Sequence, residues 1–375
     1  MQYRKLVSTG LEISALGFGT MRLPLLEGGL VDEKGAIEML RSAIERGVNY
    51  IDTAYLYHNG ESEIITGRAL EGSFRNRVYL ATKSPLWIIN QTGDFDRILA
   101  EQLKKLNTDY IDFYLLHNVR KENWQSVVLD LNLIEKAEAA KRAGKIRYIG
   151  FSFHDDFNTF KKVVDHYNWD FCQIQLNYLD VAYQAGLGGL KYAAKKGLDI
   201  IIMEPLKGGN LAAIPASVQA IFDIAPHKRT PVEWALDYLW DMPEVSLVLS
   251  GMSSPKQADE NIEYASRAYA GCLTSEEKNI IADAHKAFKS ITAIPCTACN
   301  YCMPCPSNIA IPYIFTAFND YHMGNVERAV HYYKDVVWRF GKMPSSCTKC
   351  KDCEQLCPQN LRISSLLEDV DKLFG

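Results

Sequence analysis

The chain has 375 residues, of which 47% are hydrophobic and 23% charged, a composition typical of a globular protein with one large or two ordinary domains. Its formal net charge of −4 excludes a global positive field that would attract nucleic acid or an anionic membrane. The first residues lack the apolar run of a secretory signal, and no apolar stretch has the length of a membrane span. We therefore expect a cytoplasmic protein without membrane or nucleic-acid partners.

Over the first 270 residues, apolar runs with strand character alternate with amphipathic, helix-like segments. The expected strands are Gly17–Gly19, Tyr50–Asp52, Val78–Lys83, Ile111–His117, Ile146–Ser152, Phe171–Gln175, Asp199–Glu204 and Ser246–Ser250. The expected helices are Lys34–Arg46, Ser62–Leu70, Asp94–Leu106, Trp124–Arg142, Asp156–Asp165, Leu187–Lys196, Pro231–Asp241 and Pro255–Ala265. Eight such units in about 250 residues predict an α/β fold of the (β/α)8 TIM barrel type. A doubly wound sheet is disfavoured because the sequence has no G-x-G-x-x-G turn.

Four polar residues stand at or just after the carboxyl ends of predicted strands, where such barrels place their chemistry. Asp52, Lys83 and His117 end the second, third and fourth strands, and Tyr57 follows Asp52 by five residues. Alone, each has an ordinary alternative: a capping aspartate, a surface lysine, a core histidine, or one tyrosine among 20, with Tyr55 close by. Together they predict a catalytic pocket.

With these residues in place, the sequence resembles the aldo-keto reductase family from about Gly17 to Asn261. The matching stretches are Asp52 to Tyr57, Gly60 to Glu63, Ala81 to Lys83, Leu115 to His117, Gln173 to Asn177, Gly251 to Pro255, and Glu260 with Asn261. The resemblance implies hydride transfer between a nicotinamide and a small-molecule carbonyl or alcohol. Some members carry a cysteine-rich C-terminal extension, and the tail of this chain resembles it.

Hydride addition to a carbonyl creates an alkoxide that needs a proton donor. A free phenol titrates near pH 10, and a neighbouring ammonium lowers that pKa by stabilising the phenolate. Tyr57 is therefore the expected general acid–base, Lys83 the group that tunes it, and Asp52 the partner that keeps Lys83 charged. His117 is expected to donate a hydrogen bond to the substrate oxygen.

The resemblance also implies contacts to the nicotinamide cofactor. The expected contacts are Ser152, Gln173, Met203, Leu206, Lys207, Gly208, Gly251, Ser253, Lys256, Gln257 and Asn261. Phe153 replaces the usual asparagine, and Met203 stands where many members stack a tyrosine on the nicotinamide. Gly251 and Gln257 stand where a lysine and an arginine often bind the 2′-phosphate, with Lys256 as an alternative. NADP and NAD both stay open.

Eight of the ten cysteines lie in the tail, in two runs that each end before a proline. The runs are Cys296, Cys299, Cys302 and Cys305, then Cys347, Cys350, Cys353 and Cys357. The second run has the C-x2-C-x2-C-x3-C-P spacing of 4Fe-4S ligation, and the first is one residue shorter. Zinc would also use eight cysteines, but zinc ribbons use separated pairs. A disulfide framework would be spread over a small secreted chain. We therefore expect two 4Fe-4S clusters.

In two-cluster ferredoxins the fourth cysteine of each run ligates the other cluster. The first cluster is then expected on Cys296, Cys299, Cys302 and Cys357, and the second on Cys347, Cys350, Cys353 and Cys305. Apolar residues between the runs recur at helical spacing, among them Val326, Ala329, Val330, Tyr333, Val336 and Val337. The tail thus resembles an all-α ferredoxin-like iron-sulfur domain. We expect a barrel over residues 1–285 and a helical two-cluster domain over 286–375.

The leading hypothesis is an NAD(P)-dependent oxidoreductase of the aldo-keto reductase type, whose clusters serve electron transfer or structure. One alternative is a ferredoxin-linked electron-transfer protein with a ferredoxin or flavodoxin as its partner. Another is a protein whose clusters are a non-catalytic scaffold or redox sensor. The substrate is not indicated, because the loops that would select it vary freely. Trp87 is a candidate for lining the pocket or for packing.

Overall fold

A computed structural model of the chain describes residues 1–291, 293–323, 326–340 and 342–375, the side chains of 338–340 excepted. The chain divides into two compact units. Unit 1 comprises Met1–Pro205 and Val232–Thr274, and unit 2 comprises Leu206–Pro231 and Ser275–Gly375. Each unit has its own hydrophobic core. Within the described residues, no helix combines the length and the apolar character needed to cross a membrane.

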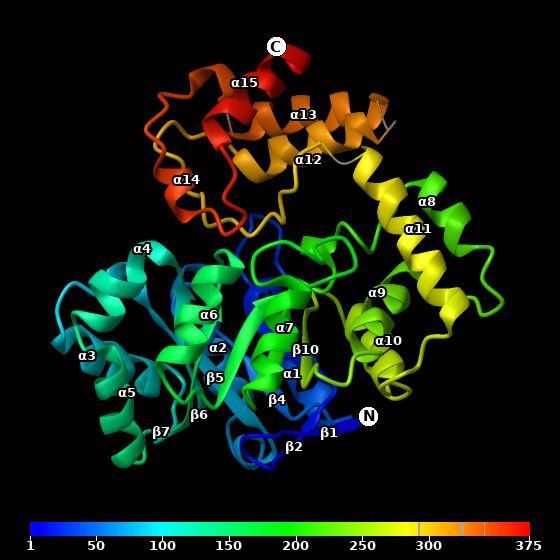
Figure 1. The fold of residues 1–375 in the computed structure, drawn as a ribbon. Helices are drawn as coiled ribbons and strands as arrows, with labels where there is room; N and C mark the ends of the chain where they lie inside the picture. The colour runs from blue at the N-terminus through cyan, green and yellow to red at the C-terminus, as the bar shows by residue number, and fades with distance from the viewer. Residues whose placement is uncertain (292, 324–325, 341) are drawn as a thin grey trace. The chain divides into compact units, whose positions relative to one another are not determined.

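In unit 1, parallel strands close into a barrel in the order β10-β3-β4-β5-β6-β7-β8-β9 (Figure 1). The strands are β3 (Leu16–Gly19), β4 (Tyr50–Asp52), β5 (Tyr79–Pro85), β6 (Ile111–Val119), β7 (Ile146–Phe153), β8 (Phe171–Gln175), β9 (Asp199–Met203) and β10 (Leu247–Gly251). Each strand pairs with its neighbours in the chain, and β10 pairs with β3 to close the ring. A hairpin of β1 (Tyr3–Lys5) and β2 (Glu12–Ser14) precedes the barrel. The predicted (β/α)8 barrel is confirmed.

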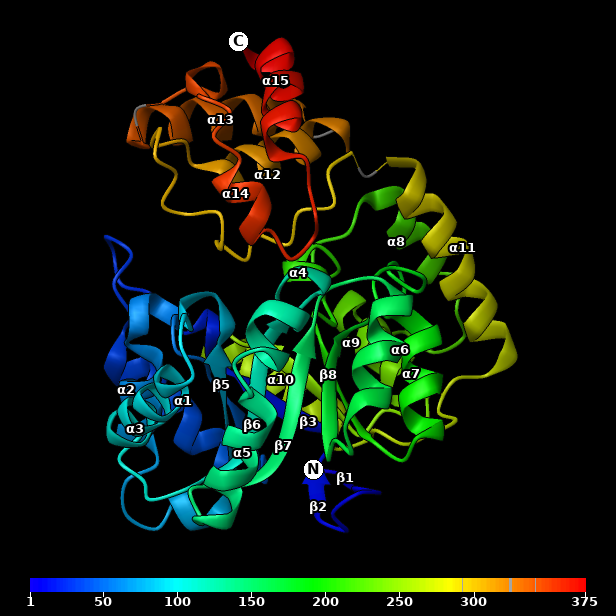
Figure 2. The same cartoon turned by 60° about the vertical axis from the view of Figure 1, so that its left-hand side comes forward.

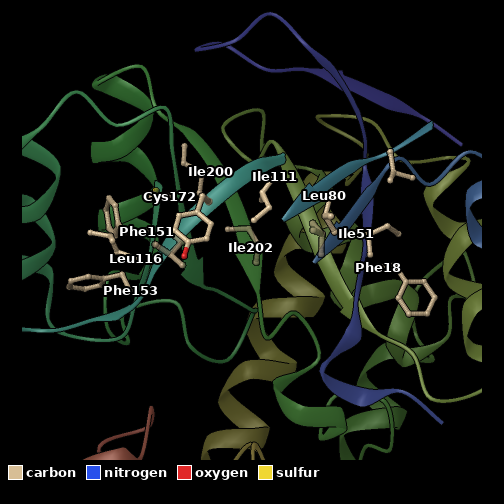
Figure 3. Close-up of a cluster of buried hydrophobic side chains, with 14 of the residues drawn as sticks. Phe18, Ile51, Leu80, Ile111, Leu116, Phe151, Phe153, Cys172, Ile200 and Ile202 are labelled. Carbon is tan, nitrogen blue, oxygen red and sulfur yellow. The ribbon is translucent and has the colours of Figure 1, made fainter. Parts of the chain in front are cut away.

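Helices alternate with these strands and lie around the outside of the barrel (Figure 2). They are α1 (Glu33–Glu45), α2 (Ser62–Ala69), α3 (Gly93–Lys105), α4 (Lys121–Asn123), α5 (Leu133–Arg142), α6 (Phe157–His166), α7 (Gly186–Lys195), α9 (Pro231–Trp240) and α10 (Pro255–Ala265). Buried apolar side chains form the layer between strands and helices. Figure 3 shows part of this layer, with Phe18, Ile51, Leu80, Ile111 and Phe151 contributed by five successive strands.

One predicted helix is wrong in extent. The expected helix Trp124–Arg142 is split into α4, a π-helical turn over Trp124–Leu129, and α5. Asn132 adopts a left-handed conformation, with φ 53° and ψ 44°, just before α5 begins. A helix cannot continue through such a residue, and asparagine tolerates this conformation better than most residues do.

A second apolar cluster fills the interior of the barrel. The Phe113 ring lies at its centre, 5.2 Å from the ring of Tyr50 and 5.0 Å from that of Phe171, measured between centroids. Ala81 and Leu115 belong to the same cluster. Because side chains alternate along a strand, residues two positions further along also face the interior, nearer the carboxyl ends of the strands.

Unit 2 contains helices and the two cysteine-bearing loops. The helices are α8 (Ala216–Phe222), α11 (Ser275–Ile291), α12 (Ile311–His322), α13 (Val326–Phe340), α14 (Asp352–Leu356) and α15 (Ile363–Phe374). Its core joins Phe315 of α12, Tyr333 of α13 and Val370 of α15. Asn319 of α12 exchanges two hydrogen bonds with the backbone of Ile294, just before the first cysteine run. The expected domain boundary between residues 285 and 286 stays a prediction.

Candidate active site and cysteine loops

Three of the four predicted catalytic residues occupy interior-facing positions at the carboxyl ends of adjacent strands. Asp52 ends β4, Lys83 lies on β5, and His117 lies on β6. Two residues earlier on the same strands, the side chains belong to the apolar cluster of the interior, namely Tyr50, Ala81 and Leu115. Strand alternation therefore turns all three polar side chains into the interior, and their positions near the strand ends place them at the same end of the barrel.

The Lys83 ammonium makes one contact for each of its three N–H donors. It donates to Asp52 Oδ1 at 2.6 Å, to the Thr53 carbonyl at 2.8 Å and to Tyr57 Oη at 3.4 Å. Lys83 is 1% exposed and Asp52 is 3% exposed, so water competes little for these contacts. Burial lowers the pKa of Lys83, and the Asp52 carboxylate opposes that shift.

The structure distinguishes Tyr57 from its neighbour Tyr55. The Lys83 ammonium lies 4.9 Å from the centre of the Tyr57 ring as well as near its hydroxyl. Tyr55 instead donates to Glu101 of α3 at 2.8 Å, with Lys105 located 4.1 Å from its ring centre. Tyr57 is therefore the tyrosine that meets the buried lysine.

His117 lies between two aromatic rings. Its ring centroid is 6.3 Å from that of Tyr57 and 5.0 Å from that of Trp87, so Trp87 lies beside the tetrad. Burial, with smaller contributions from Lys83 and His154, holds the pKa of His117 well below its usual range. His117 is thus a neutral imidazole near pH 7, in which one ring nitrogen carries an N–H.

Sequence reasoning missed a second buried histidine. His154 directly follows β7 and is 7% exposed. Burial, reinforced by Arg120, lowers the pKa of His154 to about 3. Its electrostatic interactions reach both Lys83 and His117, which places it near the tetrad. Its position immediately after a strand end was the available signal, since a lone histidine has no motif spacing.

Three of the expected cofactor residues come together in unit 1. Ser152 on β7 is paired in register with Gln173 on β8. The Ser152 hydroxyl accepts a hydrogen bond from the Asn118 amide at 2.8 Å, which fixes its orientation. Gln173 contacts the Met203 sulfur at 3.7 Å. Leu206, Lys207 and Gly208, by contrast, belong to unit 2.

The remaining cofactor candidates flank the start of α10. Gln257 accepts a hydrogen bond from the Ser253 amide at 2.9 Å. Asn261 is buried and donates to Ser250 Oγ at 3.1 Å. Lys256 is exposed and lies 3.8 Å from Glu260. Lys256 therefore has an exposed charge here, while Gln257 is engaged by the loop itself.

Arg22 is a cation near this loop that sequence reasoning missed. Its side-chain carbons lie 3.3 Å from the point where a Cβ of Gly251 would be, so glycine leaves room for them. Arg22 follows β3, and the closure of the barrel pairs Gly19 with Gly251. The two residues are far apart in the sequence, so no local pattern indicates their contact.

In unit 2, four cysteines from both runs line one pocket. The cysteines are Cys296, Cys299, Cys302 and Cys357, and the apolar residues Ile311, Phe315 and Leu361 lie beside them. Burial, followed by the nearby thiols Cys299, Cys296 and Cys357, raises the pKa of Cys302. Such a thiol gives up its proton when it ligates iron.

The other four cysteines also gather from both runs. Burial raises the pKa of Cys353 to about 11, with contributions from Glu354 and then from Cys305, Cys350 and Cys347. Cys305 thus lies among the thiols of the second run, as Cys357 lies among those of the first. Both groupings have the composition of the crosswise ligand sets expected from ferredoxins.

The two cysteine runs share one loop geometry. The Ala298 amide donates to Cys296 Sγ at 3.4 Å, and the Lys349 amide donates to Cys347 Sγ at the same distance. In each run the residues on both sides of the second cysteine have positive φ: Ala298 and Asn300, then Lys349 and Lys351. Non-glycine residues hold this conformation at a cost of about 1–3 kcal/mol each, and such strain clusters at ligand sites.

A second local repeat follows the fourth cysteine of each run. Cys305 begins C-P-S-N and Cys357 begins C-P-Q-N. In both, the asparagine has positive φ and its amide donates to the cysteine carbonyl, Asn308 at 2.8 Å and Asn360 at 3.1 Å. The C-P-x-N repeat is visible in the sequence and indicates matching turns at Cys305 and Cys357.

The barrel and its pocket define an enzyme of the oxidoreductase class. The Aldo/keto reductase family matches residues 15–270, so the chain belongs to that family, and a 4Fe-4S dicluster domain matches residues 295–361.

Relatives agree with this assignment. An oxidoreductase called YqkF from Bacillus subtilis is 30% identical over 74% of this chain and 94% of its own length. The aldo-keto reductase YhdN of the same organism is 39% identical over 44% of this chain, a match that spans 51% of YhdN. The holo form of aldo-keto reductase AKR11C1 from Bacillus halodurans superposes with a TM-score of 0.64 at 28% identity, covering 76% of this chain and 96% of that one.

Proposed function

We propose that the chain transfers hydride between NAD(P)(H) and the carbonyl or hydroxyl group of a small molecule, with Tyr57 as its general acid–base. The observation that carries this proposal is the buried Lys83 ammonium, which contacts both Asp52 and the Tyr57 hydroxyl. That arrangement stabilises a phenolate. The phenol can therefore give a proton to an alkoxide and recover it in the reverse reaction.

In reduction, a bound nicotinamide supplies the hydride to the carbonyl carbon. Tyr57 donates its proton to the oxygen as negative charge develops there, and Lys83 stabilises the resulting phenolate. Neutral His117 donates a hydrogen bond to the same oxygen and orients it. Asp52 keeps Lys83 charged and fixed, and the Trp87 ring lies 5.0 Å from the His117 ring between centroids.

Ser152, Gln173 and Met203 are the residues proposed to hold the nicotinamide ring. Leu206, Lys207 and Gly208 are proposed to hold the pyrophosphate, and the loop before α10 the remaining phosphate or ribose, through Gly251, Ser253, Lys256, Gln257 and Asn261. Arg22 adds a cation beside Gly251, which would suit the 2′-phosphate of NADP.

We also propose two 4Fe-4S clusters, one on Cys296, Cys299, Cys302 and Cys357 and one on Cys347, Cys350, Cys353 and Cys305. The pocket shared by the first four thiols supports the first set, and the thiols around Cys353 support the second. The cytoplasm, which we propose as the location, keeps such thiols reduced and available to iron.

The function is tested with anaerobically purified, iron-loaded protein. A panel of aldehydes and ketones is offered with NADPH and NADH deuterated at C4, and the alcohols are analysed by mass spectrometry. We expect one deuterium at the carbinol carbon with at least one nicotinamide. Absence of labelled alcohol across the panel with both nicotinamides contradicts the proposed hydride transfer.

A ferredoxin or flavodoxin is a second candidate partner, favoured by the surface around Cys350. Cys350 is exposed and is flanked by the exposed residues Lys349 and Lys351. A bound cluster would supply one-electron transfer there, and Lys351 would attract an acidic carrier, whereas Lys349 already forms an ion pair with Glu368. Stopped-flow reduction by ferredoxin should slow with salt and in a Lys351→Glu variant. A rate independent of both would contradict this docking.

A further inference from the structure

The loop that follows β9 is bound to the first cysteine run within unit 2. The Asn210 side-chain amide donates a hydrogen bond of 3.0 Å to the Cys296 carbonyl. This carbonyl belongs to the first cysteine of the run, and the Sγ of the same residue accepts from Ala298. The loop is therefore held by the same segment that presents the first thiol.

Backbone packing reinforces this contact. A Cβ built on Gly208 would lie 2.1 Å from the Thr297 carbonyl oxygen, closer than any real contact, so the two backbones touch directly. Gly208 also has a φ of +66°, and Thr297 is 1% exposed. Only glycine fits between the left-handed turn and the cysteine run.

The loop directly follows a barrel strand, and this place in the chain indicates a role in phosphate binding. β9 is the seventh barrel strand in chain order, and in (β/α)8 barrels the loops after the seventh and eighth strands commonly bind phosphate. The short 3-10 turn over Lys207–Gly209 carries the backbone amides of Lys207 and Gly208 and the buried Lys207 side chain. Backbone amides of this kind are an anion-binding feature only while the turn is held in place.

We propose that Asn210 and Gly208 are positioning residues that make nucleotide affinity depend on the first cluster. Iron bound to Cys296 fixes the run, and the run fixes the loop through its Cys296 and Thr297 carbonyls. Loss of the first cluster releases both contacts and weakens phosphate binding. This inference rests on the proposed use of NAD(P).

The first test compares the iron-loaded full chain with the same chain depleted by a chelator, using NADPH fluorescence to measure Kd. We expect depletion to raise Kd by about fivefold or more, the lower end of allosteric couplings. By reciprocity, saturating NADPH should protect the clusters, so iron release to the chelator is slower with nucleotide present. A Kd that changes less than twofold on depletion overturns the inference.

The second test changes Asn210 in iron-loaded protein. Asn210→Asp keeps the shape but replaces the donor to the Cys296 carbonyl with an acceptor, so KM for NADPH should rise about fivefold while kcat stays near wild type. Asn279→Asp makes the same charge change at an exposed position of α11 and should leave KM unchanged. A KM for Asn210→Asp equal to that of Asn279→Asp overturns the inference.

A third comparison follows cluster retention without nucleotide. Gly208→Ala should accelerate iron release because its methyl meets the Thr297 carbonyl. Gly209→Ala adds the same methyl at a left-handed position with nothing within 4 Å, and should release iron like wild type. Equal rates for the two variants contradict the proposed packing. If the wild-type protein binds neither NADPH nor NADH, the proposed function fails. If it binds a nucleotide tightly and the Kd is the same with and without iron, only this inference is rejected.

Discussion

The barrel pocket and the cysteine loops are organised in opposite ways. The tetrad comes from three strands and a loop that are brought together by barrel closure, and Lys83 already binds Asp52, Thr53 and Tyr57. The proposed cluster ligands come from two short runs, in which left-handed residues flank the second cysteine of each. Burial raises the pKa of the Cys302 thiol, so this thiol needs iron to become charged at neutral pH.

This difference predicts which part depends on its cofactor. Hydrogen bonds and an apolar interior layer hold the barrel pocket, so its geometry is expected to survive without a nucleotide. The strain of the cysteine loops must be offset by metal ligation, since binding free energy is also folding free energy in such sites. Four predictions follow from this contrast.

The largest effect is expected at the acid–base. Tyr57→Phe removes the proton that the alkoxide needs, so kcat should fall by about 10²–10⁴-fold. Nucleotide Kd and iron content should be unchanged, because the phenol ring and the cysteine loops stay in place. Tyr55→Phe is the matched control, since Tyr55 binds Glu101 instead. Similar losses in both variants would argue against Tyr57 as the acid–base.

The next effect is at the buried ion pair. Asp52→Asn leaves Lys83 without its counter-charge and should destabilise the barrel by about 3–5 kcal/mol, because an uncompensated charge stays buried. Burial lowers the pKa of Lys83, and the Asp52 carboxylate opposes this shift. Its removal should therefore lower the pKa of Lys83 further and reduce kcat.

The double variant Asp52→Asn, Lys83→Met separates stability from catalysis. Replacing both charges should recover part of the lost stability in thermal unfolding but none of the activity. Recovery of activity by the double variant would show that the pair is only structural.

The cysteine loops provide a smaller, countable effect. Cys299→Ser and Cys357→Ser should each remove about half of the bound iron, and the double variant should lose no more than either alone if both ligate one cluster. Cys299→Ser combined with Cys350→Ser should lose nearly all iron. Additive loss in the first pair would overturn the crosswise ligand sets. Colorimetric iron and sulfide assays, which do not depend on activity, measure the number of iron and sulfide ions bound per chain.

The smallest effect concerns pH and the buried histidine. Because the folded-state pKa of His154 is about 3 and its ordinary value is 6.5, the unfolded chain binds a proton first as pH falls. Stability should therefore be full above about 6.5 and decline toward pH 3, by up to ~1.4 kcal/mol per pH unit from this residue. His154→Gln should flatten the decline between pH 7 and 5.5 in urea unfolding. Exposed His227→Gln is the control, and equal slopes in both would contradict the assignment.

The sequence was most informative where its signal is local. Strand starts and ends such as Tyr50–Asp52 and Phe171–Gln175 were predicted with the bounds that the structure has. The cysteine runs carry their ligand spacing within a few residues. The single helix expected over Trp124–Arg142 is wrong because Asn132 adopts a left-handed conformation. Helix propensity does not predict this backbone conformation.

By itself the sequence therefore determined the barrel, the tetrad residues and the two cysteine runs, because period, strand-end position and spacing are properties of short segments. Tertiary structure decided which tyrosine meets Lys83, which thiols gather with Cys302, and that Arg22 lies over Gly251. It also decided that Asn210 binds the Cys296 carbonyl. These contacts join residues far apart in the chain, and only closure of the barrel and packing of the helices bring such groups within hydrogen-bond or van der Waals range.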